Sequence, residues 1–282
     1  MRCAWDAFIN LLPQWMRGQV DRLGRDALQE LRLRLGQAPE LVLGVTSHHL
    51  ERVTGREDLA FCVNAASRYS PWSAATASLG YITAPGGHRV GLCGEAVMQN
   101  GVMTGIRSPT SLCLRVARDF PGIAARVPKT NASMLILGRP GAGKTTLLRD
   151  LIRQRSETLP GSVTVVDERG ELFPKGEDGF YFPPGKRTDI LTGCAKRDGI
   201  ETALRTMGPS CIAVDEITAQ ADCDALLRAG WCGVTLLATA HASGRKDLFT
   251  RPVYRPLVES GLFNTLLILQ QDKSWQLERM DI

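Results

Sequence analysis

The stretch Gly138-Arg139-Pro140-Gly141-Ala142-Gly143-Lys144-Thr145-Thr146 decides the fold of this 282-residue chain. The apolar run Met134–Leu137 precedes it, and residues 146–152 follow in a helix-forming pattern, so the order is strand, glycine-rich loop, helix. This is the context of a phosphate-binding P-loop, in which glycines let several backbone N–H groups point at one phosphate. A glycine-rich turn that binds nothing requires neither a lysine nor a threonine at its end. Residues 138–146 are therefore predicted to bind a nucleotide.

Two side chains at the end of this loop carry most of the expected chemistry. The positive end of the following helix attracts phosphate, Lys144 neutralises the outer phosphates, and the Thr145 hydroxyl can ligate Mg²⁺. Because folding does not need the Lys144 ammonium, we expect it to be accessible to solvent when no nucleotide is bound.

Residues 127–131, Val-Pro-Lys-Thr-Asn, form a polar break just before the apolar run 134–137. We place a domain boundary there, between residues 1–128 and 129–282. The second part alternates helical segments with short apolar runs, at 134–137, 162–166, 211–214, 234–238 and 265–269. Such runs are typical of a parallel sheet covered on both faces, so the fold class of this part is α/β. The stretch 172–192 is rich in proline and glycine and is predicted to be a surface loop near the site.

The first part has the pattern of a smaller α+β domain. Its predicted elements are a helix over residues 5–23 split at Pro13, a hairpin of residues 31–35 and 40–43, a helix over 56–69, and short strands at 81–83, 88–92, 95–98 and 101–104. We identify no chemistry of its own in this domain.

The composition limits the class of protein to which the chain can belong. Hydrophobic residues make up 44% and charged residues 22% of the chain, which is ordinary for a globular protein. No window approaches the roughly 18 apolar residues of a membrane span, and the N-terminus is too mixed for a signal peptide. Eight cysteines without a Cys-x-x-Cys pair indicate reduced thiols in a cytosolic protein, and His48 and His49 have no cysteines at zinc-site spacing. Most of the net charge of +5 lies in residues 1–128, and this mildly basic half fits contact with acidic lipid or a partner protein, and equally a solvated surface.

Two interpretations compete for the kind of nucleotide. Asp167-Glu-Arg-Gly170 matches the Asp-x-x-Gly switch of a GTPase, and Ala195-Lys-Arg-Asp198 half-matches the guanine-reading Asn-Lys-x-Asp. The second match lacks the asparagine and does not end a strand, so it gives the GTPase interpretation little support.

The segment Cys211-Ile-Ala-Val-Asp215-Glu216 favours an ATPase, because it is an apolar strand that ends in two acids. An acid at the carboxyl end of a strand beside a P-loop holds Mg²⁺, usually through its waters, which is the Walker B role predicted for Asp215. The adjacent Glu216 can polarise the attacking water as a general base. The predicted metal ligands are therefore Thr145 and Asp215, and the predicted cofactors are ATP and Mg²⁺.

The next apolar strand, 234–240, ends at His241. An imidazole in that position can sense or contact the γ-phosphate. The alternative is a histidine with a purely structural role.

Six segments in order carry a resemblance to a known family. They are Glu30-Leu-Arg-Leu-Arg-Leu35, the loop and helix 138–150, Val166-Asp-Glu-Arg-Gly-Glu171, Ala203-Leu-Arg-Thr-Met-Gly-Pro209, Val214-Asp-Glu-Ile217 and Ala238-Thr-Ala-His241. Together they resemble the stage III sporulation protein AA family, which is similar to the hexameric traffic ATPases of type II and type IV secretion and pilus assembly. The resemblance implies a RecA-like P-loop ATPase domain with a parallel sheet, preceded by a smaller α+β N-terminal domain that makes partner or oligomer contacts.

The resemblance also implies roles for single residues. The acidic box of the secretion ATPases falls on Asp167 and Glu168, and their histidine box on His241. Arg205 is a candidate for contacting a neighbouring subunit's phosphate, the alternative being a solvated residue or a local salt-bridge partner. The implied catalytic set is Glu216, Lys144, Arg205, His241 and Glu168. Arg139 departs from the family, which more often has a small residue or proline there.

The family's role implies a homo-hexameric mother-cell ATPase at the cytoplasmic face of the membrane. It would energise a membrane-embedded complex during spore formation, without a membrane span of its own and without nucleic acid. A RecA-like nucleic-acid motor is one alternative, but it would need a basic groove or stacking aromatics, and aromatics are 6% of the chain. A scaffold that binds ATP without turnover is another, and its signature would be loss of the Walker B glutamate, which is present as Glu216.

Overall fold

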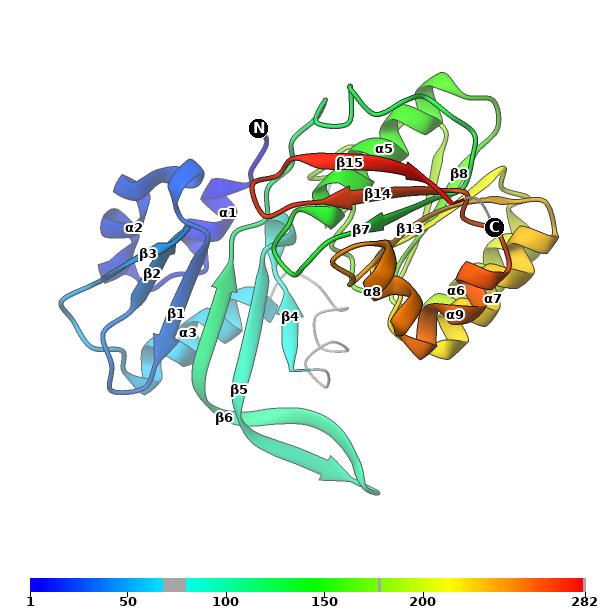
Figure 1. Ribbon diagram of the computed structural model, residues 1–282. Coiled ribbons are helices and arrows are strands. Elements are labelled where there is room, and N and C mark those ends of the chain that lie inside the picture. The colour runs from blue at the N-terminus through cyan, green and yellow to red at the C-terminus, as the bar shows by residue number, and fades with distance from the viewer. Residues whose placement is uncertain (68–79, 177–178, 281–282) are drawn as a thin grey trace. The chain divides into compact units, whose positions relative to one another are not determined.

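The computed structural model describes residues 1–67, 80–176 and 179–280 (Figure 1). Contacts divide the chain into two units. The first unit consists of Met1–Asp119 and Pro174–Tyr181, and the second of Phe120–Phe173 and Phe182–Ile282. Each unit has its own hydrophobic core.

The boundary between the units follows Asp119, whereas the sequence predicts it at residue 128. Residues 120–127 belong to the second unit because Ala124 and Val127 are buried in its core. The carboxylate of Asp150 also accepts the backbone N–H groups of Gly122 and Ala124, at 3.0 and 2.8 Å. These contacts come from a helix more than twenty residues downstream, which no local pattern in the sequence indicates.

The second unit is built on a seven-stranded sheet in the order β11-β8-β12-β13-β7-β14-β15. All neighbouring strands are parallel except the last pair, β14 and β15. The strands are β7 (Met134–Leu137), β8 (Val163–Asp167), β11 (Thr188–Thr192), β12 (Cys211–Val214), β13 (Thr235–Ala240), β14 (Thr265–Leu269) and β15 (Trp275–Arg279). The helices are α5 (Lys144–Thr158), α6 (Lys196–Thr206), α7 (Gln220–Trp231), α8 (Arg245–Thr250) and α9 (Arg255–Glu259), with a 3₁₀ turn at Pro252–Tyr254.

Successive residues of the central strands face opposite sides of this sheet. Met134 and Ile136 of β7 pack in the core that contains α5, and Leu135 and Leu137 pack in the core that contains α6, α7 and α9. In Figure 1, α5 accordingly lies on one side of the sheet and α6, α7 and α9 lie on the other. The predicted α/β fold with a parallel sheet covered on both faces is therefore confirmed.

Only part of the stretch 172–192 is the surface loop that the sequence predicts. Leu172 and Phe173 are fully buried, and residues 188–192 form the edge strand β11, which pairs in parallel with β8. This strand is only half-buried and contains two apolar residues in five, so it lacks the continuous apolar run of the central strands. The edge position of β11 therefore explains why its sequence does not show the apolar run that is typical of a strand in a parallel sheet.

The first unit is built on a six-stranded antiparallel sheet in the order β3-β2-β1-β6-β5-β4. The strands are β1 (Glu30–Arg34), β2 (Glu40–Leu43), β3 (Thr46–His49), β4 (Tyr81–Thr83), β5 (Arg89–Gln99) and β6 (Val102–Arg115). The helices are α1 (Trp5–Asn10), α2 (Gln14–Ala27) and α3 (Arg56–Ser67), with a 3₁₀ turn at Pro85–Gly87 and the small strands β9 (Lys175–Gly176) and β10 (Gly179–Phe180). The break at Pro13 and the β1–β2 hairpin are as predicted. Residues 68 and 69, the end of the helix predicted over 56–69, lie outside the described residues.

The main difference in this unit is that β5 and β6 form one long hairpin rather than several short strands. The register shifts between Cys93 and Glu95, so Gly94 marks a β-bulge within β5. A Cβ at Gly94 would lie 2.8 Å from the carbonyl oxygens of Arg107 and Ser108. In the sequence a glycine bulge is difficult to distinguish from the end of a strand.

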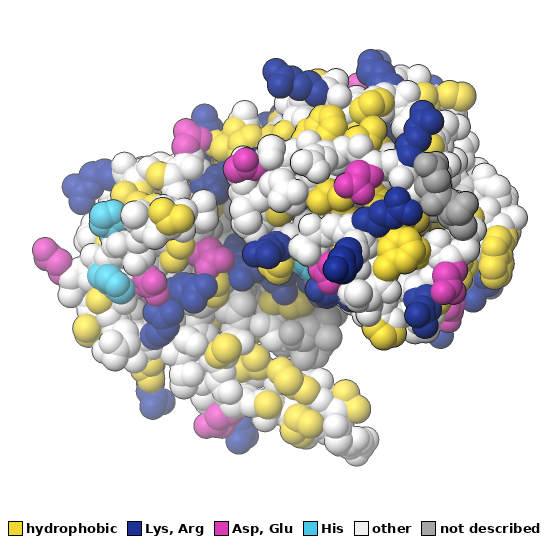
Figure 2. All heavy atoms as spheres, in the orientation of Figure 1, with side chains coloured by type: hydrophobic (Ala, Val, Ile, Leu, Met, Phe, Trp, Pro, Cys, Tyr) yellow, Lys and Arg dark blue, Asp and Glu magenta, His cyan; other side chains and the backbone are white. Residues whose placement is uncertain are grey.

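Hydrophobic side chains cover much of this hairpin in Figure 2. Val97, Met98 and Val102 near its turn are 37%, 59% and 65% exposed. Within the described part of the chain, no helix combines the length and the apolar character needed to cross a bilayer.

Candidate nucleotide site

The P-loop connects the end of β7 to the start of α5 at the carboxyl edge of the sheet. Gly141 and Gly143 have φ angles of 76° and 101°, a left-handed region that glycine enters without steric cost. The helix α5 begins at Lys144 immediately after this turn. In the remainder of the predicted loop, Arg139 and Pro140 are exposed, Gly138 and Ala142 are buried, and Thr145 and Thr146 are half-buried.

Lys144 is 7% exposed, so its predicted accessibility to solvent is wrong. Its Nζ donates to the carbonyl oxygens of Gly138 at 2.9 Å and Arg139 at 3.2 Å, and lies 3.0 Å from Nδ1 of His241. Burial lowers the pKa of Lys144, while the nearby carboxylates of Asp215 and Glu216 act in the opposite direction. A buried ammonium needs hydrogen-bond acceptors, and the carbonyls of its own loop provide them.

Asp215 follows β12 and lies against the P-loop helix. The Thr145 hydroxyl donates to Asp215 Oδ2 at 2.7 Å, and the Thr239 hydroxyl donates to Asp215 Oδ1 at 2.6 Å. A hydroxyl beside a carboxylate fits Mg²⁺, which prefers oxygen ligands and usually takes only one or two from the protein. The described residues contain no group of three His, Cys, Asp or Glu side chains able to hold a metal alone. The donor set therefore fits a magnesium ion that shares its coordination with phosphate and water.

Glu216 has a φ of 52°, which is unusual for a residue with a side chain. Its carboxylate lies 2.8 Å from Nε2 of His241 and 3.3 Å from Nη1 of Arg169. Burial raises the pKa of Glu216, but the His241 hydrogen bond and the Arg169 charge outweigh this effect, so the pKa is lowered. The glutamate is therefore ionised at neutral pH.

The hydrogen bonds also fix the tautomer of His241. The Lys144 ammonium can only donate, so Nδ1 of His241 must accept, and Nε2 carries the hydrogen that is donated to Glu216. Lys144, His241, Glu216 and Arg169 thus form one continuous chain of hydrogen bonds.

The two residues of the predicted acidic box have different environments. Asp167 is buried, and its carboxylate accepts the N–H groups of Glu171, Leu172 and Phe173, at 3.0, 2.9 and 3.2 Å. Burial raises the pKa of Asp167 to about 6, although these N–H groups lower it. Glu168 instead pairs with Lys196 at the start of α6. Asp167 therefore shapes the loop after β8, and Glu168 is held beside that loop.

Arg205 does not join the other predicted site residues. The helix α6 starts with Lys196 at the carboxyl edge of the sheet and runs back toward the amino edge, where β12 begins. Eleven helical residues span about 16 Å, which separates Arg205, in the last turn, from the P-loop of its own chain. Arg205 is exposed and has no ion-pair partner among the residues that the structure describes.

Four polar residues at the site were not assigned a role from the sequence: Thr239, Arg169, Lys196 and Lys273. Ala238 of β13 pairs with Val214 of β12, so Thr239 comes opposite Asp215. Knowledge of the pairing of β12 and β13 would therefore have indicated that Thr239 lies at the site. Lys273, in the turn between β14 and β15, donates to the carbonyl oxygen of Gly141. No local pattern identifies this contact.

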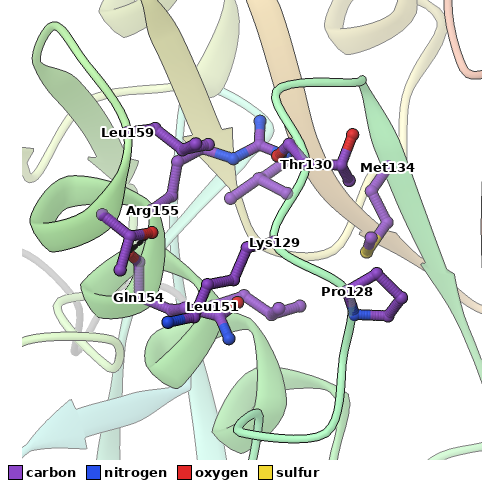
Figure 3. A pocket seen from close by; sticks show the side chains of 10 residues that line it. Pro128, Lys129, Thr130, Met134, Leu151, Gln154, Arg155 and Leu159 are labelled. Atoms are coloured by element: carbon purple, nitrogen blue, oxygen red, sulfur yellow. Dashed lines mark hydrogen bonds between the residues drawn. The ribbon is translucent and has the colours of Figure 1, made fainter.

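An open cavity of ≈ 240 Å³ adjoins the P-loop. Its lining includes Arg139, Pro140, His241 and Ser243. A second cavity, of ≈ 10 Å³, lies where β7 begins, between Met134, Leu151 and Arg155 (Figure 3). It is too small for a nucleotide and lies at the opposite edge of the sheet from the P-loop.

Comparisons with known proteins show the family and the fold of this chain. The family model described as "Sporulation stage III, protein AA" matches residues 9–277. The stage III sporulation protein AA of Bacillus subtilis (strain 168) is 34% identical over 278 residues, covering 93% of this chain and 90% of that protein. The uncharacterised protein ycf45 of Cyanidium caldarium is 31% identical over 177 residues, covering 60% of this chain and 52% of that protein.

Two solved structures share the fold. The pilus retraction motor PilT with bound ADP has a TM-score of 0.58 at 14% identity, covering 94% of this chain and 82% of that chain. The ATPase DotB of Yersinia pseudotuberculosis has a TM-score of 0.59 at 15% identity, covering 95% of this chain and 79% of that chain. At these identities the similarity concerns the fold alone.

Proposed function

This chain belongs to the sporulation stage III protein AA family, and we propose that it hydrolyses ATP with Mg²⁺ at the P-loop site. The observation that carries this proposal is the arrangement of the two acids after β12. Asp215 accepts a hydrogen bond from Thr145, and Glu216 lies against His241 and Arg169. In this proposal, the first carboxylate would hold the nucleotide-bound metal, and the second, which is ionised at neutral pH, would face the γ-phosphate.

The P-loop residues would bind the nucleotide. Backbone N–H groups of residues 138–146, apart from Pro140, which has none, and the Lys144 ammonium would contact the phosphates. To do so, Lys144 would give up at least one of its three present acceptors, the carbonyls of Gly138 and Arg139 and Nδ1 of His241. Thr145 and Asp215 would hold Mg²⁺, which supplies positive charge to the phosphoryl oxygens during transfer.

Glu216 would act as the general base. Its lowered pKa keeps it ionised, so it can orient a water molecule and accept the proton that the water loses. His241 and Arg169 hold the two carboxylate oxygens, and Lys196 and Glu168 lie next to this group.

At the level of the assembly, the proposal is a motor that works as a ring of six identical chains. The N-terminal unit would contact partners or neighbouring subunits, and the ring would energise a membrane-embedded complex from the cytoplasmic face in the mother cell. Family membership and the fold shared with a pilus retraction motor and a DotB ATPase support this proposal.

The test compares the purified wild type with Glu216→Gln. We expect the variant to bind ATP and Mg²⁺ normally but to lose about 10²- to 10⁴-fold in turnover, because an amide cannot accept the proton. Glu201→Gln is a matched control, since Glu201 pairs with Arg228 on the surface of α6. Normal turnover by Glu216→Gln would contradict the assigned base.

The same assay separates the alternatives. Stimulation of turnover by DNA or RNA would favour a nucleic-acid motor. Tight ATP binding by the wild type with no turnover under any condition would favour a nucleotide-dependent scaffold.

A further inference from the structure

Thr239 lies between the two acids of the site and is completely buried. Its hydroxyl donates to Asp215 Oδ1 at 2.6 Å and accepts the backbone N–H of Glu216 at 2.7 Å. A hydroxyl has one hydrogen, a carboxylate can only accept, and an amide N–H can only donate. Both directions are therefore determined, and no other assignment of the hydrogen is possible.

The backbone of Thr239 reinforces this connection. Its carbonyl oxygen accepts the N–H of Ile217 at 2.9 Å, just beyond the last paired residues of β12 and β13. One residue thus contacts three consecutive residues after β12 through its side chain and its main chain. Only the side-chain contacts involve the two acids.

The hydroxyl also supports a strained conformation. Glu216 has a φ of 52°, a left-handed conformation that costs free energy for a residue with a Cβ and persists only where neighbouring groups hold it. The Thr239 hydroxyl is the acceptor for the Glu216 N–H. In this conformation the Glu216 carboxylate reaches His241 and Arg169.

We propose that Thr239 is a positioning residue for ATP hydrolysis, whose single hydroxyl aligns Asp215 and holds the backbone of Glu216. This inference rests on the proposed ATPase function. Thr239 acts through the two acids and is not itself a catalytic group.

A buried threonine elsewhere in the same sheet provides a control. Thr164 in β8 is 2% exposed, and its hydroxyl has no hydrogen-bond partner among the described residues. Burial of a threonine in this sheet therefore does not by itself require a paired hydroxyl. Thr164→Val replaces one strand threonine by an isosteric valine without removing a hydrogen bond.

The experiment measures kcat and KM for ATP in Thr239→Val, Thr239→Ser and Thr164→Val, together with ATP affinity with and without Mg²⁺. For Thr239→Val we expect kcat to fall about 10- to 100-fold, because the Asp215 carboxylate and the Glu216 N–H each lose a hydrogen-bond partner. We expect its metal-free ATP affinity to remain normal, because the P-loop is unchanged, and the gain in affinity from Mg²⁺ to diminish. Thr239→Ser keeps the hydroxyl and should recover most of the activity, and Thr164→Val should match the wild type.

Each of the following results would overturn the proposal: normal kcat in Thr239→Val, an equal loss in Thr164→Val, or a serine variant as impaired as the valine variant. If Thr239→Val does not fold, Thr239→Ala gives the same comparison against Thr239→Ser. In a Glu216→Gln background, the valine change should lower turnover less than it does in the wild type, because the part of its effect that acts through the base is already absent. A fully additive loss there would also contradict positioning through Glu216.

This design separates two kinds of failure. A wild type without turnover contradicts the ATPase function, whereas the Mg²⁺-dependent affinities still test whether Thr239 aligns Asp215. A wild type with turnover that Thr239→Val retains contradicts only the positioning role.

Discussion

At the residue scale, His241 is shared between the P-loop and the proposed base. Nδ1 accepts from Lys144 and Nε2 donates to Glu216, so the imidazole connects the cation of the glycine-rich loop to the carboxylate that would activate water. A nucleotide that draws the Lys144 ammonium away from Nδ1 would remove one of these two contacts of the imidazole. Nucleotide binding and the environment of the base are therefore linked through one side chain.

The first residue-scale prediction concerns Lys144. We expect Lys144→Ala to lower ATP affinity at least about 100-fold, because charge-assisted hydrogen bonds to phosphate are lost. The melting temperature should fall modestly while the protein remains folded, because the carbonyl oxygen of Gly138 and Nδ1 of His241 each lose a donor. Calorimetric titration with ATP measures the affinity, and the exposed Lys129→Ala serves as control. Unchanged ATP affinity in Lys144→Ala would contradict the assignment of residues 138–146 as the nucleotide-binding loop.

At the element scale, His88 joins the start of β5 to two distant segments of the first unit. Its ring is fully buried, its Nδ1 accepts the N–H of Ala117 at 3.0 Å, and its Nε2 donates to the carbonyl oxygen of Ala4 at 2.9 Å. Protonation would place a second hydrogen against the Ala117 N–H. The histidine therefore has a structural role in the neutral form.

This arrangement predicts a pH dependence of stability. Burial lowers the pKa of His88 to about 4, from an ordinary value of 6.5. The unfolded chain then binds more protons between these values, so stability is complete above pH 6.5 and is lost as pH falls toward 4. We expect the free energy of unfolding of the first unit to fall by about 2 kcal/mol from pH 7 to pH 5 on account of His88.

Denaturant unfolding across this pH range measures the effect. His88→Gln should remove this part of the slope, whereas His49→Gln, on the exposed strand β3, should leave the slope unchanged. If the slope persists in His88→Gln, another group is responsible.

At the scale of the whole molecule, the position of Arg205 bears on the assembly. Arg205 lies at the far end of α6 from its own P-loop, so any contact with a nucleotide must involve a neighbouring subunit. An arginine supplied across an interface to the γ-phosphate accounts for roughly 10³- to 10⁵-fold in rate.

We therefore predict that Arg205→Ala subunits and Glu216→Gln subunits, each inactive alone, recover activity when mixed. Some junctions of a mixed ring then combine an intact arginine with an intact glutamate. The measurement is phosphate release by mixtures shown to co-assemble. Mixtures of Glu216→Gln and Lys144→Ala subunits give the background rate. Glu216 and Lys144 belong to the same subunit's site, so mixing these two variants creates no intact site. Complete absence of rescue would reject the role of Arg205 in a neighbour's site and leave it as a solvated residue.

The sequence by itself determined the glycine-rich loop between β7 and α5, the two acids that follow β12 and the covered parallel sheet. These features are local: glycines permit left-handed turns, and continuous apolar runs need burial on both faces wherever they lie. The tertiary structure alone decided the edge strand β11, the burial of Lys144 and the contact of Thr239 with both acids. These depend on hydrogen bonds between segments distant in the chain, and such bonds follow from strand order and register, which no single segment encodes.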